Sequence, residues 1–163
     1  MPTDNFSAAQ KLSLLLLRVS MGVLFLYSGL SKIFDPSWSA AGYLANAKTL
    51  PGLFAFFAQP EVLPITNLLN EWGQFLIGVS LILGIFVRVS SVAGITLMVL
   101  YYLPALNGFF PNPHSFIVDE HVIYAAALFV LAASRAGRAF GLEGWCAGLP
   151  VCSRFPRLRS LVG

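Results

Sequence analysis

Several ionisable side chains of this 163-residue chain lie inside long apolar runs or at their ends. Charged groups at membrane depth are costly, so they usually face a protein interior or water and often mark functional sites. Carboxylates and an imidazole near one another can hold a polar ligand and exchange protons with it. The residues that could do such chemistry are Arg18, Lys32, Glu71, Asp119, Glu120 and His121.

Helical spacing groups some of these residues on shared faces. Arg18, Gly22, Phe25, Gly29 and Lys32 follow one another by four, three, four and three positions, which is one face of a helix. Glycines on such a face allow a second helix to approach closely. The segment therefore predicts a tightly packed face with a basic residue near each end.

A second polar stripe has the same spacing. It consists of Asn67, Glu71, Gln74 and Gly78 and should face inward. At about 1.5 Å per residue, Glu71 lies about 9 Å from the outer end of its helix, while Arg18 lies about 9 Å from the opposite end of its own helix. We therefore expect Lys32, and not Arg18, to be the partner of Glu71. For Arg18 we favour a side chain that extends to the nearer membrane interface over one with a buried role.

These residues predict an outer polar cluster, formed by Lys32, Glu71, Asp119, Glu120 and His121, which Tyr101, Tyr102 and Tyr124 could reach. Two interpretations stay open. In the structural one, Asp119 caps a helix, Glu71 pairs with Lys32, and the polar stripe fixes helix packing. In the functional one, a carboxylate and the imidazole hold the head of a quinone-like molecule or pass its protons.

The elements that must position this cluster are four apolar segments, at about 12–34, 65–87, 89–106 and 118–134. With 57% hydrophobic and 10% charged residues, the chain has too few charges to cover a soluble globule. A bilayer span needs about 20 apolar residues, so four spans leave room only for loops and a tail. The sequence predicts an all-α integral membrane four-helix bundle in a single domain. A cleaved signal peptide is the alternative interpretation of the first segment.

The connections differ in length and composition. A turn at 83–88 is so short that the second and third segments must be antiparallel neighbours. In the loop at 35–64, Thr49 could cap a short interfacial helix with Pro51 in its first turn. Pro111 and Pro113 are expected to stop the third segment. We also expect a short interfacial helix in the C-terminal tail.

Basic residues predict the orientation. One side carries Lys11 and Arg88 together with the arginines of the tail at 135–163, whereas the other side carries only Lys32 and Lys48. By the positive-inside rule both termini are cytoplasmic, in a multi-pass protein of the cell inner (cytoplasmic) membrane. Anionic lipid beside the tail explains its charge better than nucleic acid does, so no nucleic-acid partner is expected. Arg18 and Arg88 are interpreted as structural membrane charges.

The sequence carries no recognisable metal or covalent cofactor motif. Cys146 and Cys152 match neither a zinc site nor a redox pair, and in a cytoplasmic tail they should stay reduced. No second histidine at membrane depth faces His121, so haem ligation is not expected. A quinone is the one cofactor that the outer polar cluster suggests.

Several stretches of the sequence together resemble a known family. The stretch 17–25 followed by 28–34 is similar to the opening signature of the DoxX family, which includes a subunit of thiosulfate:quinone oxidoreductase. The resemblance continues through Glu71, the turn at 83–88 and the stretch 137–142. It implies a small four-helix membrane protein, in some members a membrane subunit of a redox complex. Arg18, Lys32, Glu71 and Arg88 match recurrent polar positions of the family, without a catalytic role that transfers with them.

The leading hypothesis is thus a membrane subunit that anchors or completes a redox complex and forms part of a quinone site at the outer face. The main alternative is a non-catalytic assembly subunit that packs against a larger membrane complex, or against further copies of itself. A small transporter is a weaker third hypothesis, because four helices without a repeat seldom enclose a pathway. The sequence assigns no enzymatic reaction.

Overall fold

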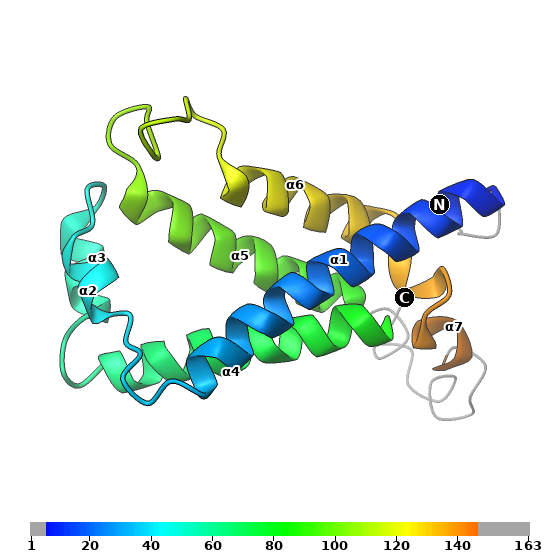
Figure 1. Ribbon diagram of the computed structural model, residues 1–163, viewed down its shortest axis with the longest axis horizontal. Coiled ribbons are helices and arrows are strands. Elements are labelled where there is room, and N and C mark those ends of the chain that lie inside the picture. Colours follow the sequence, from blue (N-terminus) through cyan, green and yellow to red (C-terminus); the bar gives the residue numbers. More distant parts are fainter. Residues whose placement is uncertain (1–5, 147–163) are drawn as a thin grey trace.

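Four long helices form the body of the molecule. The computed structural model describes residues 6–146, and within this range it contains helices and no strands. Helices α1 (Ala8–Ile33), α4 (Leu63–Leu83), α5 (Val87–Ala105) and α6 (Glu120–Ala133) lie side by side and alternate in direction (Figure 1). Each begins and ends within a few residues of a predicted segment, so the all-α class is confirmed.

Two of these helices, α1 and α5, are long and apolar enough to cross a membrane. Helix α4 is long enough, with 21 residues, but it is not among the candidate spans, and its first half carries the polar residues Asn67, Asn70, Glu71 and Gln74. Helix α6 has only 14 residues, about 21 Å at 1.5 Å per residue. That all four helices cross a bilayer therefore stays a prediction.

Local signals explain where the helices begin and end. Ser7 and Gln10 form a capping box at the start of α1, with each side chain bound to the other's backbone N–H. Gly84, in the left-handed conformation, ends α4 earlier than predicted. Helix α5 ends at Ala105 with Pro104 in its last turn, so the expectation that Pro111 and Pro113 stop this helix was wrong.

The connection between α1 and α4 contains the short helices α2 (Ala41–Ala45) and α3 (Pro51–Phe57), which lie across the ends of α4 and α5 (Figure 1). Pro51 occupies the first turn of α3, as predicted. Thr49 does not cap this helix, because its hydroxyl donates instead to the carbonyl of Leu106, at 2.7 Å. The loop that follows α1 is thereby fastened to the end of α5.

The opposite end of the molecule holds the turn between α4 and α5, the 3-10 helix η2 (Ala136–Arg138) and α7 (Leu142–Cys146). A short helix in the C-terminal segment is therefore present. Most of the predicted tail, with Cys152, lies outside the described residues. We call this the turn end of the bundle, and we call the end with α2, α3 and the loop at 106–119 the loop end.

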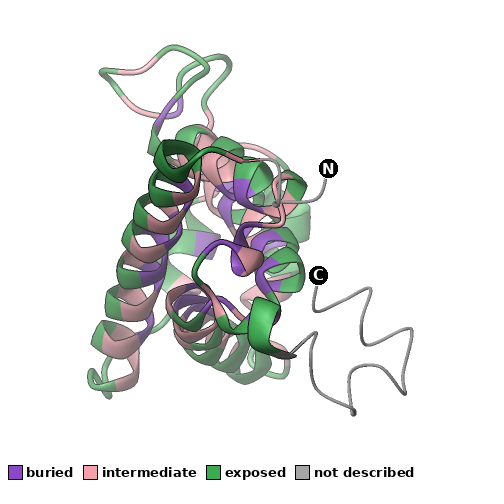
Figure 2. Cartoon of the chain, turned by 90° about the vertical axis from the view of Figure 1, so that its right-hand side faces the viewer, coloured by how far each residue is buried: buried purple, intermediate pink, exposed green. Residues whose placement is uncertain are grey.

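Helices α1 and α4 make the closest contact between long helices. A Cβ added to Gly29 would lie 2.5 Å from the backbone nitrogen of Phe75, and a Cβ on Gly78 would collide with the backbone of Leu26. Arg18, Gly22, Phe25 and Gly29 are all buried on this side of α1, which confirms the predicted face. Figure 2 shows buried residues where the helices face one another and exposed residues on their outer sides.

This contact yields a stability prediction. Gly78→Ala should destabilise the fold by about 1–3 kcal/mol, because the added methyl group must push α1 away from α4. Gly73→Ala is the matched control on the same helix, since a Cβ there meets nothing within 4 Å. The measurement is the free energy of unfolding in mixed detergent micelles. Equal stability of the two variants would show that the backbones are not in contact at Gly78.

Candidate functional site

At the loop end, Lys32 links α1 to α4. Its ammonium group donates hydrogen bonds to Gln74 Oε1, at 2.7 Å, and to Ser28 Oγ, at 2.8 Å. Glu71 lies near enough to act on Lys32 by its charge, but no ion pair joins the two residues. The predicted Lys32–Glu71 pair is thus wrong. The partner of Lys32 on α4 is the amide oxygen of Gln74, which lies one turn further along the same stripe.

The hydrogen bonds continue from Gln74 to α5. Gln74 Nε2 donates to the hydroxyl of Tyr101 at 3.1 Å, and this hydroxyl donates to Asn70 Oδ1 at 2.7 Å. Gln74 is buried, with 2% of its surface exposed. Because each group serves as donor to the next, the positions of Lys32, Gln74 and Tyr101 are fixed relative to one another.

His121 and Asp119 complete the cluster from the start of α6. Asp119 caps this helix by accepting from the backbone N–H groups of His121 and Val122, which confirms the predicted cap. Its second carboxylate oxygen lies 2.8 Å from Nδ1 of His121. An ionised Asp119 therefore selects the tautomer with the proton on Nδ1 and leaves Nε2 as an acceptor when the ring is neutral. The ring of His121 lies 6.0 Å from that of Tyr101, between centroids.

These side chains border a cavity of about 290 Å³, which we call the polar cavity. Lys32, Tyr101 and His121 line it from the long helices, and Trp38 and Tyr43 line it from the loop side. The ammonium group of Lys32 lies 5.4 Å from the ring centre of Trp38. A smaller cavity of about 140 Å³ continues inward and shares Ser28, Tyr101 and His121 with the first.

The structure thus brings together three of the five predicted cluster residues: Lys32 and His121 line the polar cavity, and Asp119 holds His121. Glu71 is half-buried and lines none of the described cavities, and Glu120 is exposed. The predicted cluster did not include Gln74, although the position of this residue on the polar stripe already indicated that it faces inward. Trp38 and Tyr43 gave no such signal, because the path of the loop places them.

The consecutive residues Asp119, Glu120 and His121 hold their potential ligand atoms within 4.8 Å of one another. The carboxylate oxygens of Asp119 already accept hydrogen bonds from the α6 backbone and from His121. This geometry is what a helix cap requires. We therefore assign the group to capping and to the orientation of His121.

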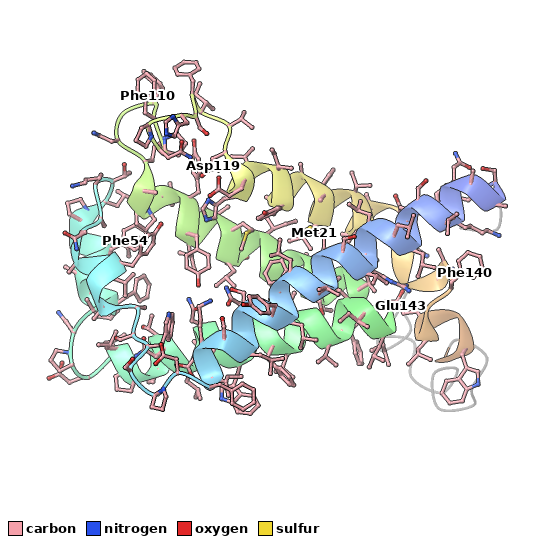
Figure 3. All side chains as sticks on the ribbon, viewed as in Figure 1. Met21, Phe54, Phe110, Asp119, Phe140 and Glu143 are labelled. Carbon is pink, nitrogen blue, oxygen red and sulfur yellow. The ribbon has the colours of Figure 1, made fainter. Side chains whose placement is uncertain are left out.

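A second polar centre lies at the turn end, as the positions of Asp119 and Glu143 in Figure 3 show. Arg18 is buried, with 1% exposed, and donates to the carbonyls of Ala136, at 2.8 Å, and Phe140, at 3.2 Å. The interpretation that Arg18 extends to the interface was wrong. Its guanidinium group binds the segment after α6 to α1, because these carbonyls offer it partners inside the protein.

Glu143 faces Arg18 in this centre and is equally buried. Its Oε1 accepts from the backbone N–H of Val87 at 2.7 Å, and its own N–H donates to the carbonyl of Gly84 at 3.0 Å. Neither Glu143 Oε2 nor Arg18 Nε has a hydrogen-bond partner among the described residues. Burial raises the pKa of Glu143 to about 7, against the lowering effects of the Val87 bond and of the charges of Arg18, Arg138 and Arg88.

This shift makes stability depend on pH in a definite direction. Between the ordinary value of 4.5 and about 7, the folded state holds a proton on Glu143 that the unfolded state has lost. Stability should therefore decrease as the pH rises through this window, by about 1–3 kcal/mol, and level off above it. Glu143→Gln, which mimics the neutral acid, should flatten the dependence, whereas the exposed control Glu120→Gln should keep it. Thermal unfolding in detergent from pH 4 to 8 tests this, and parallel profiles for wild type and Glu143→Gln would contradict it.

Comparison with known proteins adds one finding. The family model for DoxX matches residues 13–105, which is more than half of the chain. The match includes Lys32, Gln74 and Tyr101, while Asp119, His121 and Glu143 lie beyond it. No curated protein and no solved structure matches the chain.

Proposed function

The chain belongs to the DoxX family, and from this membership together with the polar cavity we propose that it is a membrane subunit of a quinone-linked redox complex. Family and apolar helices alike indicate a membrane protein. In this proposal all four long helices cross the bilayer, and the polar cavity at the loop end holds the head of a quinone. The observation that carries the proposal is a cavity bordered by an ammonium group, a phenol and a carboxylate-bound imidazole.

The proposed orientation follows from the basic residues. Arg88, Arg135 and Arg138 all lie at the turn end or next to it, which the positive-inside rule assigns to the cytoplasm. Both termini are then cytoplasmic, and the loop end faces the outer side of the inner membrane. The polar cavity lies on that outer side, between the ends of the helices.

The lining suits a quinone head in size and chemistry. A cavity of about 290 Å³ is at the small end of ligand pockets, which suits a single ring better than a whole lipid. A quinone carries two carbonyl oxygens, both acceptors. Lys32 donates within the protein to the carbonyl and hydroxyl of Ser28 and to Gln74, and it would exchange one of these acceptors for a quinone oxygen. The Asp119–His121 pair faces the other oxygen: the protonated imidazole donates from Nε2 to a quinone carbonyl, and the neutral imidazole accepts from a quinol hydroxyl.

The same residues indicate which part of quinone reduction this chain would support and which part a partner would supply. Reduction of a quinone to a quinol takes up two electrons and two protons. The chain offers the proton-exchanging groups, and a redox partner in the complex must supply or accept the electrons. The chain thus serves as the part of a redox enzyme that binds the lipid-soluble substrate in the membrane.

A non-catalytic assembly subunit is the second candidate. The loop at 106–119 carries exposed aromatic side chains, with Phe116 in ring contact with both Phe109 and Phe110 at 6.2 and 5.5 Å between centroids. Figure 3 shows Phe110 on this loop, which projects to one side of the bundle near the end of α5. Such a patch would suit contact with a larger membrane protein or with the membrane interface.

The test is purification from the native membrane in mild detergent, with partners identified by mass spectrometry and quinone quantified after extraction. We expect a redox partner and bound quinone. Lys32→Met and His121→Leu should each lower the quinone content about tenfold or more, because each removes a hydrogen bond to a buried polar head.

Two controls make this result specific. Glu120→Gln changes an exposed charge beside His121 and should leave the quinone content unchanged, and thermal unfolding verifies that each variant is folded. A folded wild type that is isolated with a partner but without quinone would favour the assembly subunit. Equal quinone content in all variants would remove the polar cavity from the proposal.

A further inference from the structure

A separate apolar cavity of about 170 Å³ lies beside the polar cavity. Leu44, Phe54 and Phe57 line it from α2 and α3, and Leu69, Leu97 and Leu100 line it from α4 and α5. Phe54 is almost fully buried and points from α3 toward the long helices (Figure 3). The lining is thus mostly hydrocarbon, and Lys32 and His121, which line the polar cavity, do not border this one.

The two cavities are neighbours that share part of their lining. Both are lined by Ala40, Tyr43 and Tyr101. The hydroxyl of Tyr43 donates to the carbonyl of Tyr101, and the two rings meet edge to face with centroids 6.0 Å apart. A ligand that occupied both cavities would pass these two tyrosines, with its polar part on the side of Lys32 and its apolar part on the side of Phe54.

The apolar cavity also reaches the outer surface of the bundle. Leu69 on α4 and Leu100 on α5 line it, yet 67% and 39% of their surfaces are exposed. Helices α4 and α5 lie furthest apart at the loop end, where α2 and α3 cover the gap (Figure 1). In a membrane the side of the bundle at Leu69 and Leu100 contacts lipid, so an apolar chain could run from the cavity into the bilayer.

The cover over this gap is anchored at several points. The backbone N–H of Lys48 donates to the carbonyl of Pro104 at 2.9 Å, and the hydroxyl of Thr49 donates to the carbonyl of Leu106. On the other side, the N–H of Ala40 donates to Asn67 Oδ1 at 3.0 Å. Because α2 and α3 are fastened to both α4 and α5, the apolar cavity is a built feature of the fold.

We propose that the ligand of the loop end is an amphiphile, with its polar head in the polar cavity and the first part of its hydrocarbon tail in the apolar cavity. This proposal rests on the proposed function for the head and adds the substrate class: a quinone with a long apolar chain, which enters from the bilayer between α4 and α5. A small polar quinone without a tail would fill only half of the site.

The test compares two quinones with the same ring, one without a tail and one with a ten-carbon chain, on the full chain in lipid nanodiscs. For each ligand the quantity measured is the ratio of the variant's Kd to that of the wild type, which cancels the partition of the ligand into the bilayer. Leu69→Trp should narrow the mouth of the apolar cavity. It should raise the Kd of the tailed quinone about tenfold and leave that of the tail-free quinone unchanged.

Leu68→Trp is the matched control, because Leu68 is the neighbouring exposed leucine on α4 but does not line the cavity. Leu97→Trp fills the cavity from inside and should have the same selective effect, with Val99→Trp as its exposed control on α5. Since Leu69 is exposed, its replacement leaves the fold intact even where Leu97→Trp does not.

The outcomes separate the two proposals. If neither quinone binds the wild type, the proposed function itself fails. If both bind and the variants at Leu69 and Leu97 affect the two ligands equally or not at all, the head site stands and the tail site is overturned. A selective loss of the tailed quinone at both positions supports the amphiphile.

Discussion

The close contact between α1 and α4 is the constraint on which the rest of the structure depends. Backbone approaches backbone where Gly22, Gly29 and Gly78 leave out a side chain. In a membrane such contacts stabilise helix pairs through dispersion forces, because lipid offers little hydrophobic driving force. This contact brings the amide of Gln74 within hydrogen-bond distance of Lys32 at the loop end. Toward the turn end, it lets Arg18 reach past the end of α4 at Gly84.

The two polar centres at the ends of this contact differ in how their charges are compensated. At the turn end, carbonyls bind Arg18, and Gly84, Gly137 and Gly141 leave no space for a further side-chain atom. A buried charge so enclosed holds segments together. At the loop end, Lys32 and His121 are also bound to neighbours, but both border an open cavity. Of these two polar centres in the described part of the chain, the one at the loop end borders a cavity, and this observation underlies the assignment of function to that end.

The sequence predicted the elements well and the partners less well. Apolar length and the spacing of glycines depend on local pattern, so the four helices and the buried face of α1 could be predicted. The choice of Gln74 over Glu71 as the partner of Lys32 depends on how far α4 is shifted along its axis relative to α1, which periodicity leaves uncertain by one turn. Arg18 was misplaced because its acceptors, the carbonyls of Ala136 and Phe140, are more than a hundred residues away. Tyr43 and Trp38 enter the site through the path of a loop, which no periodic signal describes.

The length of α6 bears on where the loop-end site lies in a bilayer. Its 14 residues span about 21 Å, against about 30 Å for a hydrocarbon core. If the turn end sits at the cytoplasmic boundary, the start of α6 at Asp119 lies below the outer boundary of the hydrocarbon core. The polar cavity is then inside the outer leaflet. A lipid-soluble ligand would reach a site at this depth from the bilayer, through the gap between α4 and α5 at Leu69 and Leu100. The short helix thus favours the same class of ligand as the apolar cavity does.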